Sequence, residues 1–325
     1  MQDFEVNTMK RLKKGILFFL TFFFLLGLCS AAASRITAGC RGCVRGRSRV
    51  FAGISAEKKD SLDVIFLGDS ESYTSFSPMD LWAQHGIASY NCGQSSQRIQ
   101  ETYYMLKTAL QTQSPKLVIL ETNLMFRDPG LAENVLLTVG EPLRFYFPAL
   151  RYHNIWKSVF DGPKTDADSF KGFPVHSDIE PYTGAKKYMQ PTDSVKKMPA
   201  HTYLYMDMIR KLCAKNNASL LLVSTTSPVN YSYPKHNALE AYARRYNIPY
   251  FDLNLDDRAG IDWEKDTMDK GDHLNLSGAR KVTAVLGSYL MENYSLPDHR
   301  GEKKYSDWNT LLEQYQTAAD RTENG

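Results

Sequence analysis

Short apolar runs alternate with helical patterns along most of this 325-residue chain, and no other feature restricts its fold as strongly. The run at 62–68 is apolar almost throughout and rich in β-branched and aromatic residues, as a buried parallel strand is. Further strands are predicted at 86–92, 116–121, 219–224 and 250–253. Apolar spacings of three and four predict helices at 96–110, 203–216, 239–247 and 277–292. The chain is therefore predicted to have an α/β fold with a doubly wound parallel sheet of about five strands.

An uncharged segment of twenty residues lies between Lys14 and Arg35. As a helix it is about 30 Å long, the thickness of the hydrocarbon core of a bilayer. Lysines precede it, and the alanines at 31–33 resemble a signal-peptidase site. Residues 1–34 are therefore predicted to be a short cytoplasmic start followed by a transmembrane anchor or a signal peptide. The protein is expected to be membrane-bound or exported.

A basic linker is predicted at 35–60, where five arginines precede the first acid, Glu57. Charges on the two flanks of the apolar segment nearly balance, so they do not fix its orientation. A large domain translocates largely regardless of such charges. We therefore expect a single-pass protein of the cell membrane with its body outside, or a secreted protein if the signal is cleaved. The arginines are interpreted as a solvated segment near anionic headgroups.

Composition argues against several classes of partner and cofactor. The formal net charge is +3, too small to indicate nucleic acid. Five scattered cysteines do not form a dense disulfide framework. Cys40 and Cys43 have redox-motif spacing, but they lack the second pair that a structural zinc site needs. A bond between them stays open, and neither a metal ion nor an organic cofactor is expected.

The body is predicted to be one α/β domain over 61–295 with an insertion at 128–200. An insertion of that length is too long for a plain loop, so we expect a lid or substrate-binding subregion there. His153 and Trp156 within it are either substrate contacts or packing residues. Residues 296–325 are predicted to be a polar tail, with an amphipathic helix near its end.

The strongest local signal for chemistry is the tripeptide Gly-Asp-Ser that ends at Ser70, directly after the first predicted strand. Ligands of open α/β sheets bind beyond the carboxyl ends of the strands, so this hydroxyl is expected in the crevice. A second polar group, with Asp269, Asp272 and His273, precedes the last predicted helix. A serine needs a base to become nucleophilic, and a histidine needs a carboxylate that fixes its tautomer. Ser70 and His273 are therefore predicted to be catalytic.

These residues resemble the SGNH, or GDSL-type, hydrolase family, whose α/β fold is flavodoxin-like. Gly-Asp-Ser after the first strand and the Asp/His block before the last helix carry the resemblance, which covers 60–127 and 203–294. The phrase DHLNLSGARKVT is similar to envelope-associated members, among them proteins of D-alanylation and polysaccharide O-acetylation. The resemblance implies Ser70 as nucleophile and His273 as base.

The resemblance also implies an oxyanion hole made by the backbone N–H groups of Ser70 and Gly93 and the side-chain amide of Asn123. The block around Asn123 reads Glu-Thr-Asn-Leu, whereas the family usually has Gly-x-Asn-Asp. The position three residues before the histidine, where the family has its acid, is a lysine here. Asp269 is favoured because adjacent side chains on an extended backbone point apart, whereas a turn at residue 271 favours Asp272. Both stay candidates for the acid.

The function predicted from these residues is two-step acyl transfer. His273 takes the proton of Ser70, Ser70 attacks an ester carbonyl, and the acyl-serine passes its acyl group to water or to a sugar hydroxyl. We therefore expect a membrane-anchored serine esterase or acyltransferase acting on acyl esters, chiefly O-acetyl, of envelope or extracellular glycans, with small esters as further substrates. Envelope-modification proteins are possible partners. The alternative is a non-catalytic SGNH-like scaffold or glycan-binding subunit of an envelope-modification system.

Overall fold

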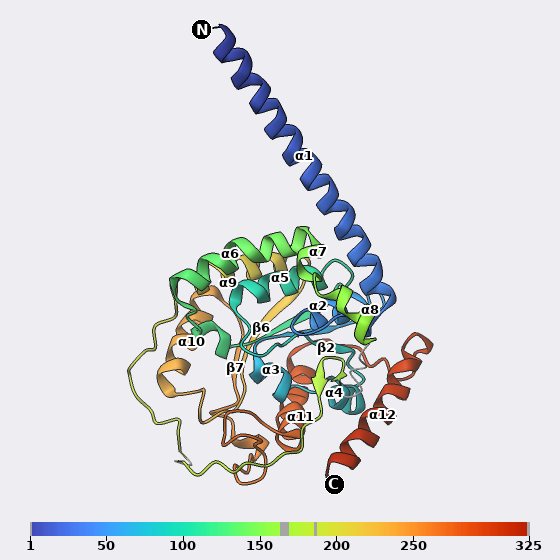
Figure 1. The fold of residues 1–325 in the computed structure, drawn as a ribbon. Coiled ribbons are helices and arrows are strands. Elements are labelled where there is room, and N and C mark those ends of the chain that lie inside the picture. Colours follow the sequence, from blue (N-terminus) through green and yellow to red (C-terminus); the bar gives the residue numbers. More distant parts are fainter. Residues whose placement is uncertain (1, 163–168, 185–186, 324–325) are drawn as a thin grey trace.

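The computed structural model describes residues 2–162, 169–184 and 187–323. At its centre is a five-stranded parallel sheet with the strand order β2-β1-β3-β6-β7 (Figure 1). The strands are β1 (Val64–Leu67), β2 (Ser89–Asn91), β3 (Leu117–Glu121), β6 (Ser219–Ser224) and β7 (Tyr250–Asp252). The predicted α/β fold class is confirmed, and each strand of this sheet lies within a predicted one.

Helices cover both faces of the sheet because its central strands are apolar in both directions. All four residues of β1 are fully buried. Ile65 and Leu67 belong to the core that contains α5, α9 and α10, whereas Val64 and Phe66 belong to the core beneath much of α11. The bounds of these helices are α5 (Ile99–Ala109), α9 (Ala200–Lys215), α10 (Tyr233–Tyr246) and α11 (Leu276–Asn293).

The order of the strands places a topological switch point between β1 and β3. The chain passes from β1 through α3 (Ser70–Ser75) and α4 (Pro78–His85) to β2 on one side, and β3 pairs with β1 on the other side. In doubly wound sheets a crevice opens at such a point, beyond the carboxyl ends of the strands. Ser70 follows β1 and Asn123 follows β3, so both predicted site residues lie at this switch point.

The segment at 128–200 has two parts with different neighbours. Its first part contains α6 (Gly130–Tyr146), α7 (Pro148–Arg151) and α8 (Ser158–Asp161). There α6 packs on α5, and α7 packs on the N-terminal helix. The second part begins with a short hairpin of β4 (Ser169–Phe170) and β5 (Phe173–Pro174). It continues as a coil that donates a hydrogen bond from the backbone of Glu180 to Thr267, near His273.

The N-terminal helix α1 (Gln2–Gly39) contains the whole uncharged segment and projects from the body (Figure 1). It is long and apolar enough to cross a membrane, and a signal sequence has the same properties. Its second half contacts the body: Phe23 stacks on Phe147, and Ser30, Ala33 and Thr37 are buried. Cys40 and Cys43 follow it and form a disulfide.

Two segments that were expected outside the domain pack on it. Helix α2 (Ser48–Ser55), in the predicted linker, buries Phe51 and Ile54 in the core. Helix α12 (Ser306–Glu323), in the predicted polar tail, packs Trp308 against Trp82 with ring centroids 5.0 Å apart. The tail is therefore polar only on its outer side, and its amphipathic helix belongs to the body.

Candidate active site

Ser70 is the first residue of α3, at the end of β1. Asp69 caps this helix because its Oδ1 accepts the N–H of Glu71 at 3.1 Å. Gly68 is required at the turn, since a Cβ there would lie 2.6 Å from the Cβ of Ser72. Ser70 is 7% exposed, and its hydroxyl makes no hydrogen bond within the described part of the chain. Among the described residues, therefore, no hydrogen bond joins the Ser70 hydroxyl to His273.

Asn91, the last residue of β2, anchors the helix of Ser70 to the sheet. Its Nδ2 donates to the carbonyl oxygens of Ser72 at 2.9 Å and Phe76 at 3.0 Å. Its Oδ1 accepts the hydroxyl of Ser72 at 3.1 Å. Because Asn91 is fully buried, these bonds are shielded from water and hold α3 in a fixed position on the sheet.

His273 is held by Asp269 through two hydrogen bonds. The Nδ1 atom of His273 lies 2.5 Å from Oδ2 of Asp269, and the backbone N–H of His273 donates to Oδ1 at 2.6 Å. Lys270 and Gly271 have φ values of 62° and 86°, a left-handed turn that brings Asp269 back to the ring. The nearer oxygen of Asp272 is 3.9 Å from Nδ1. The turn predicted at residue 271 is present, but it brings the carboxylate of Asp269, and not that of Asp272, to the imidazole ring.

The loop of His273 is fixed from both sides. Ser227 donates its hydroxyl to the carbonyl oxygens of Gly271 and Asp272, each at 2.9 Å. Thr267 accepts the N–H of Gly271 at 2.8 Å and donates to the carbonyl oxygen of His273 at 2.9 Å. These bonds fix the backbone of the loop. The imidazole side chain of His273 is 18% exposed.

Asn230 joins the helix of Ser70 to the loop of His273. Its side-chain amide donates to Oδ1 of Asp272 at 2.5 Å and also to Oε1 of Glu71. In the described residues, Glu71, Asp272 and His273 are the one group whose ligand-type atoms all lie within 4.8 Å of one another. The Asn230 amide already bridges the two carboxylates, so these side chains are engaged with a neutral donor and do not form an open cation site.

The two other predicted oxyanion donors are engaged within the protein. The N–H of Gly93 donates to Oδ1 of Asn91 at 2.9 Å. Nδ2 of Asn123 donates to Oδ2 of Asp69 at 3.0 Å, and an amide group has a second hydrogen. A Cβ on Gly93 would lie 2.9 Å from the carbonyl oxygen of Asp69, so this glycine is next to the turn of Ser70. To stabilise an oxyanion, the N–H of Gly93 would have to donate to the oxyanion and to Asn91 at the same time. Asn123 would donate the second hydrogen of its amide group, which its bond to Asp69 does not use.

Three carboxyl groups near Ser70 are fully buried: Asp69, Glu71 and Glu121. The sequence analysis predicted no role for any of them. Asp69 pairs with Arg127, and Glu121 accepts hydrogen bonds from the hydroxyl of Tyr231 and the N–H of Asn123. The third, Glu71, is fully buried, and its Oε2 has no hydrogen-bond partner among the described residues. A buried acceptor without a partner is costly when charged, which favours a protonated carboxyl group.

Burial raises the pKa of both glutamates. The pKa of Glu71 is raised well above its ordinary value, first by burial and then by the charges of Glu121, Asp69 and Asp272. Burial and the charge of Asp69 raise the pKa of Glu121 to about 8. Burial likewise lowers the pKa of Lys235, whose ammonium group donates to Oδ1 of Asn123 at 3.1 Å. Glu71 and Glu121 therefore hold their protons more strongly than free glutamates do.

Several supporting residues were missed at the level of sequence. Asn91 and Glu121 end strands β2 and β3, and Asn230 follows β6, so all three are polar residues beyond the carboxyl ends of parallel strands. A polar residue at the end of a predicted strand is the sequence feature that could have identified them, because ligands of open α/β sheets bind there. His153 is exposed and bonds to the carbonyl oxygen of Leu150 beside α7, and no contact joins it to His273.

No protein-family model and no curated protein matches the sequence. Solved structures with a similar arrangement include a GDSL-like lipase from Bacteroides thetaiotaomicron, with 14% identity and a TM-score of 0.40 over 76% of this chain and 98% of the other. A protein described as an acylhydrolase from Bacteroides fragilis has 15% identity and a TM-score of 0.37 over 73% and 90% of the two chains. A lipolytic protein ascribed to the G-D-S-L family from Desulfitobacterium hafniense has 13% identity and a TM-score of 0.38 over 69% and 97%. At these sequence identities and TM-scores, the similarity does not assign an activity to this chain.

The raised pKa of Glu121 gives a testable dependence of stability on pH. Between pH 4.5, the ordinary pKa of a glutamate, and about pH 8, this carboxyl is protonated in the folded chain and ionised in the unfolded chain. The folded state therefore binds more protons, and this group's contribution to stability falls as pH rises through that window, by at most ~1.4 kcal/mol per pH unit. We expect Glu121→Gln to remove this contribution. Urea unfolding of wild type and variant in detergent at pH 5 to 8 measures it, and parallel pH profiles would contradict it.

Proposed function

We propose that this chain is a serine esterase or acyltransferase of the SGNH type that forms an acyl-serine intermediate at Ser70. The observation that carries the proposal is the pair of hydrogen bonds from His273 to Asp269, in a loop tied through Asn230 to the helix that Ser70 begins. A serine at a helix N-terminus, an oriented imidazole and a carboxylate supply the nucleophile, the base and the orienting acid of acyl transfer.

In the proposed first step His273 accepts the Ser70 proton as Oγ attacks the carbonyl carbon of an ester. With Nδ1 bonded to Asp269, the other ring nitrogen, Nε2, is the one available for this proton. The tetrahedral intermediate collapses, and His273 returns the proton to the leaving alcohol. In the second step water or a sugar hydroxyl gives its proton to His273 and attacks the carbonyl carbon of the acyl-serine. The bond between this carbon and Oγ then breaks, and His273 returns the proton to Oγ of Ser70.

The negative oxygen of the tetrahedral intermediate requires donors. The N–H of Ser70 lies at the N-terminus of α3, where backbone N–H groups have no helical partner. The second amide hydrogen of Asn123 is the next candidate, and the N–H of Gly93 would contribute by sharing its bond to Asn91. Each such donor contributes roughly 3–4 kcal/mol in well-studied hydrolases.

Ser70 and His273 are expected to act as one unit. Ser70→Ala and His273→Ala should each lower kcat on a small acetyl ester by at least ~10³-fold, and the double variant should be hardly slower than either single variant. Steady-state kinetics of the three variants measures this, with circular dichroism as the control for folding. Additive losses, or wild-type turnover by Ser70→Ala, would refute the catalytic unit.

The two aspartates are expected to differ strongly. Asp269→Asn should lower kcat by about 10⁴-fold, as loss of a triad carboxylate does, because an amide favours the wrong tautomer of His273. Asp272→Asn is the matched control, since it lies in the same loop, has similar exposure and bonds to Asn230 instead. Kinetics on the same ester compares them. Equal losses, or a larger loss for Asp272→Asn, would contradict the assignment.

The proposed substrate is an acyl ester, chiefly O-acetyl, on an envelope or extracellular glycan. Tyr182 and Trp263 support it, because these partly exposed rings lie 6.3 Å apart beside the loop of His273 and Tyr182 contacts Gly271. Tyr182→Ala should raise KM for an acetylated oligosaccharide severalfold and leave p-nitrophenyl acetate turnover nearly unchanged. Tyr203→Ala, an exposed tyrosine on α9, is the control. Equal effects on both substrates would count against a glycan.

Anchoring by α1 with the body outside is part of the proposal. The disulfide of Cys40 and Cys43 directly after α1 supports it, because disulfides persist in oxidising compartments. Secretion after signal cleavage is the other outcome, and envelope-modification proteins are the proposed partners. Protease added to intact spheroplasts should digest the body without lysis. Digestion only after lysis would place the body in the cytoplasm.

A non-catalytic scaffold or glycan-binding subunit is the second candidate. The engaged donors favour it, since the N–H of Gly93 and Nδ2 of Asn123 already bond to acceptors within the protein. A scaffold would bind the glycan without turnover, and Ser70→Ala would leave that binding and the cellular function intact.

A further inference from the structure

Helix α6 has an apolar face that points away from the body. The residues on this face are separated by one, three or four positions, which places them on one side of a helix. They are each 43–83% exposed: Leu131, Val135, Leu136, Val139, Leu143 and Tyr146. A surface helix in water normally turns its polar side outward. A contiguous apolar stripe of this kind on the outside of a domain indicates a nonaqueous neighbour.

The polar side chains of α6 bond to partners on the body or on α6 itself. Asn134 accepts a hydrogen bond from Gln100 of α5 at 2.6 Å. Glu141 is buried and pairs with Arg144 and with Arg151 of α7, and Glu133 pairs with Arg98. The two acids, Asn134 and Arg144 thus have partners within the protein, and none of these four residues interrupts the apolar stripe. The helix is amphipathic, but with its apolar side turned outward.

Contacts with α1 fix the position of this face along the proposed membrane span. The ring of Phe23, in the middle of the uncharged segment, stacks on Phe147, the residue after α6, at 5.9 Å. Ser30 accepts the N–H of Ala149 in α7 at 3.4 Å. From Phe23 to Ser34, the end of that segment, α1 rises about 16 Å, which is half the thickness of a hydrocarbon core. The end of α6 therefore lies beside the half of the span nearer the body.

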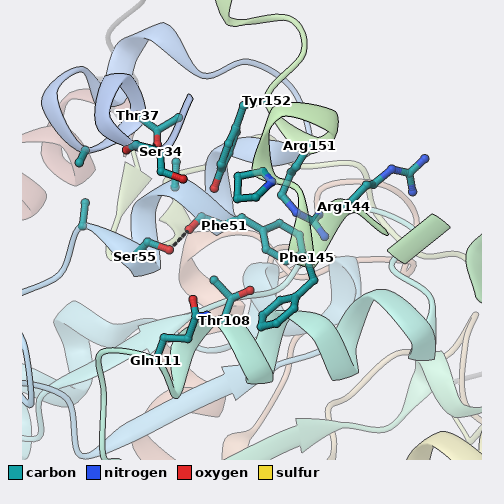
Figure 2. A pocket seen from close by; sticks show the side chains of 14 residues that line it. Ser34, Thr37, Phe51, Ser55, Thr108, Gln111, Arg144, Phe145, Arg151 and Tyr152 are labelled. Atoms are coloured by element: carbon teal, nitrogen blue, oxygen red, sulfur yellow. Dashed lines mark hydrogen bonds between the residues drawn. The ribbon is translucent and has the colours of Figure 1, made fainter. Parts of the chain in front are cut away.

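The figures show the same arrangement. In Figure 1, α6 runs along the edge of the body from which α1 projects. A cavity of about 270 Å³ lies at the junction. Figure 2 shows side chains that line it: Ser34 and Thr37 of α1, Phe51 of α2, Phe145 of α6 and Arg151 of α7. The two helices are thus attached to the end of α1 around this cavity, so their height relative to the span does not depend on a free linker.

We infer that the outward face of α6 lies in the lipid bilayer that α1 spans, in the leaflet nearer the body. The occupant is lipid, because a water-facing stripe without charge is unfavourable and the adjacent span sets this face at membrane depth. Trp156 and Phe160, which follow α7 and are 57% and 79% exposed, supply the aromatic side chains that favour the headgroup level. The body then has a fixed orientation on the membrane. This inference rests on the proposed anchoring by α1.

Site-directed spin labelling of the full chain in phospholipid nanodiscs tests it. Cys29→Ala removes the exposed free thiol, and the other described free thiols, Cys92 and Cys213, are buried. Labels are placed by Leu136→Cys and Val139→Cys on α6. Leu20→Cys reports on the span, and Ile179→Cys, an aliphatic site with 55% exposure in the coil near His273, is the matched control. Oxygen, which partitions into lipid, and a water-soluble nickel chelate are the two relaxing agents.

We expect the labels at 136 and 139 to be relaxed severalfold more by oxygen than by nickel, as at 20, with the reverse at 179. Nickel accessibility at 136 and 139 equal to that at 179, while 20 is in lipid, would overturn docking and leave anchoring intact. Nickel accessibility at 20 would overturn the anchoring itself. Exclusion of both agents at 136 and 139, dependent on protein density, would replace lipid by a second copy of the chain.

Discussion

The bridge made by Asn230 between Glu71 and Asp272 is the contact on which the candidate site depends. One carboxylate belongs to the helix that Ser70 begins, and the other belongs to the loop that carries His273. Oxygen atoms of Glu71 and Asp272 lie within 4.8 Å of each other, so the two groups would repel if both were charged. A neutral amide donor joins them, while burial keeps the pKa of Glu71 high. Residues some two hundred positions apart are thereby held at one crevice.

The insertion at 128–200 links the candidate site to the N-terminal helix α1. Its first part, α6 and α7, packs on α5 and on the end of α1. Its second part runs along the loop of His273, where His176 accepts the N–H of Leu276 at 2.7 Å. One inserted segment therefore does two things: it sets the height of the body on the proposed span, and it supports the loop that carries the proposed base.

Much of the fold could be predicted from the sequence because the strands are buried on both faces and are therefore nearly continuous apolar runs. The choice between Asp269 and Asp272 could not, since it depends on two successive left-handed residues, Lys270 and Gly271, and only one of them is a glycine. The amphipathic helix of the tail was predicted but its packing on the domain was not, because an apolar stripe does not show which surface covers it; in the structure Trp308, Tyr315 and Ala319 lie in the core. Asn91 ends β2 and Asn230 follows β6, and the order of the strands in the sheet brings both residues near Ser70. Neither lies in a recognisable motif, so the sequence did not indicate their roles.

Mass spectrometry of the full chain after brief exposure to an acyl-ester probe tests the central claim most directly. The account predicts a single acyl group on the peptide that contains Ser70, absent from Ser70→Ala and strongly reduced in His273→Ala. Rapid quenching in acid preserves the ester. A folded wild-type protein that turns over the probe without any adduct at Ser70, or that acquires the same adduct elsewhere in Ser70→Ala, would contradict it.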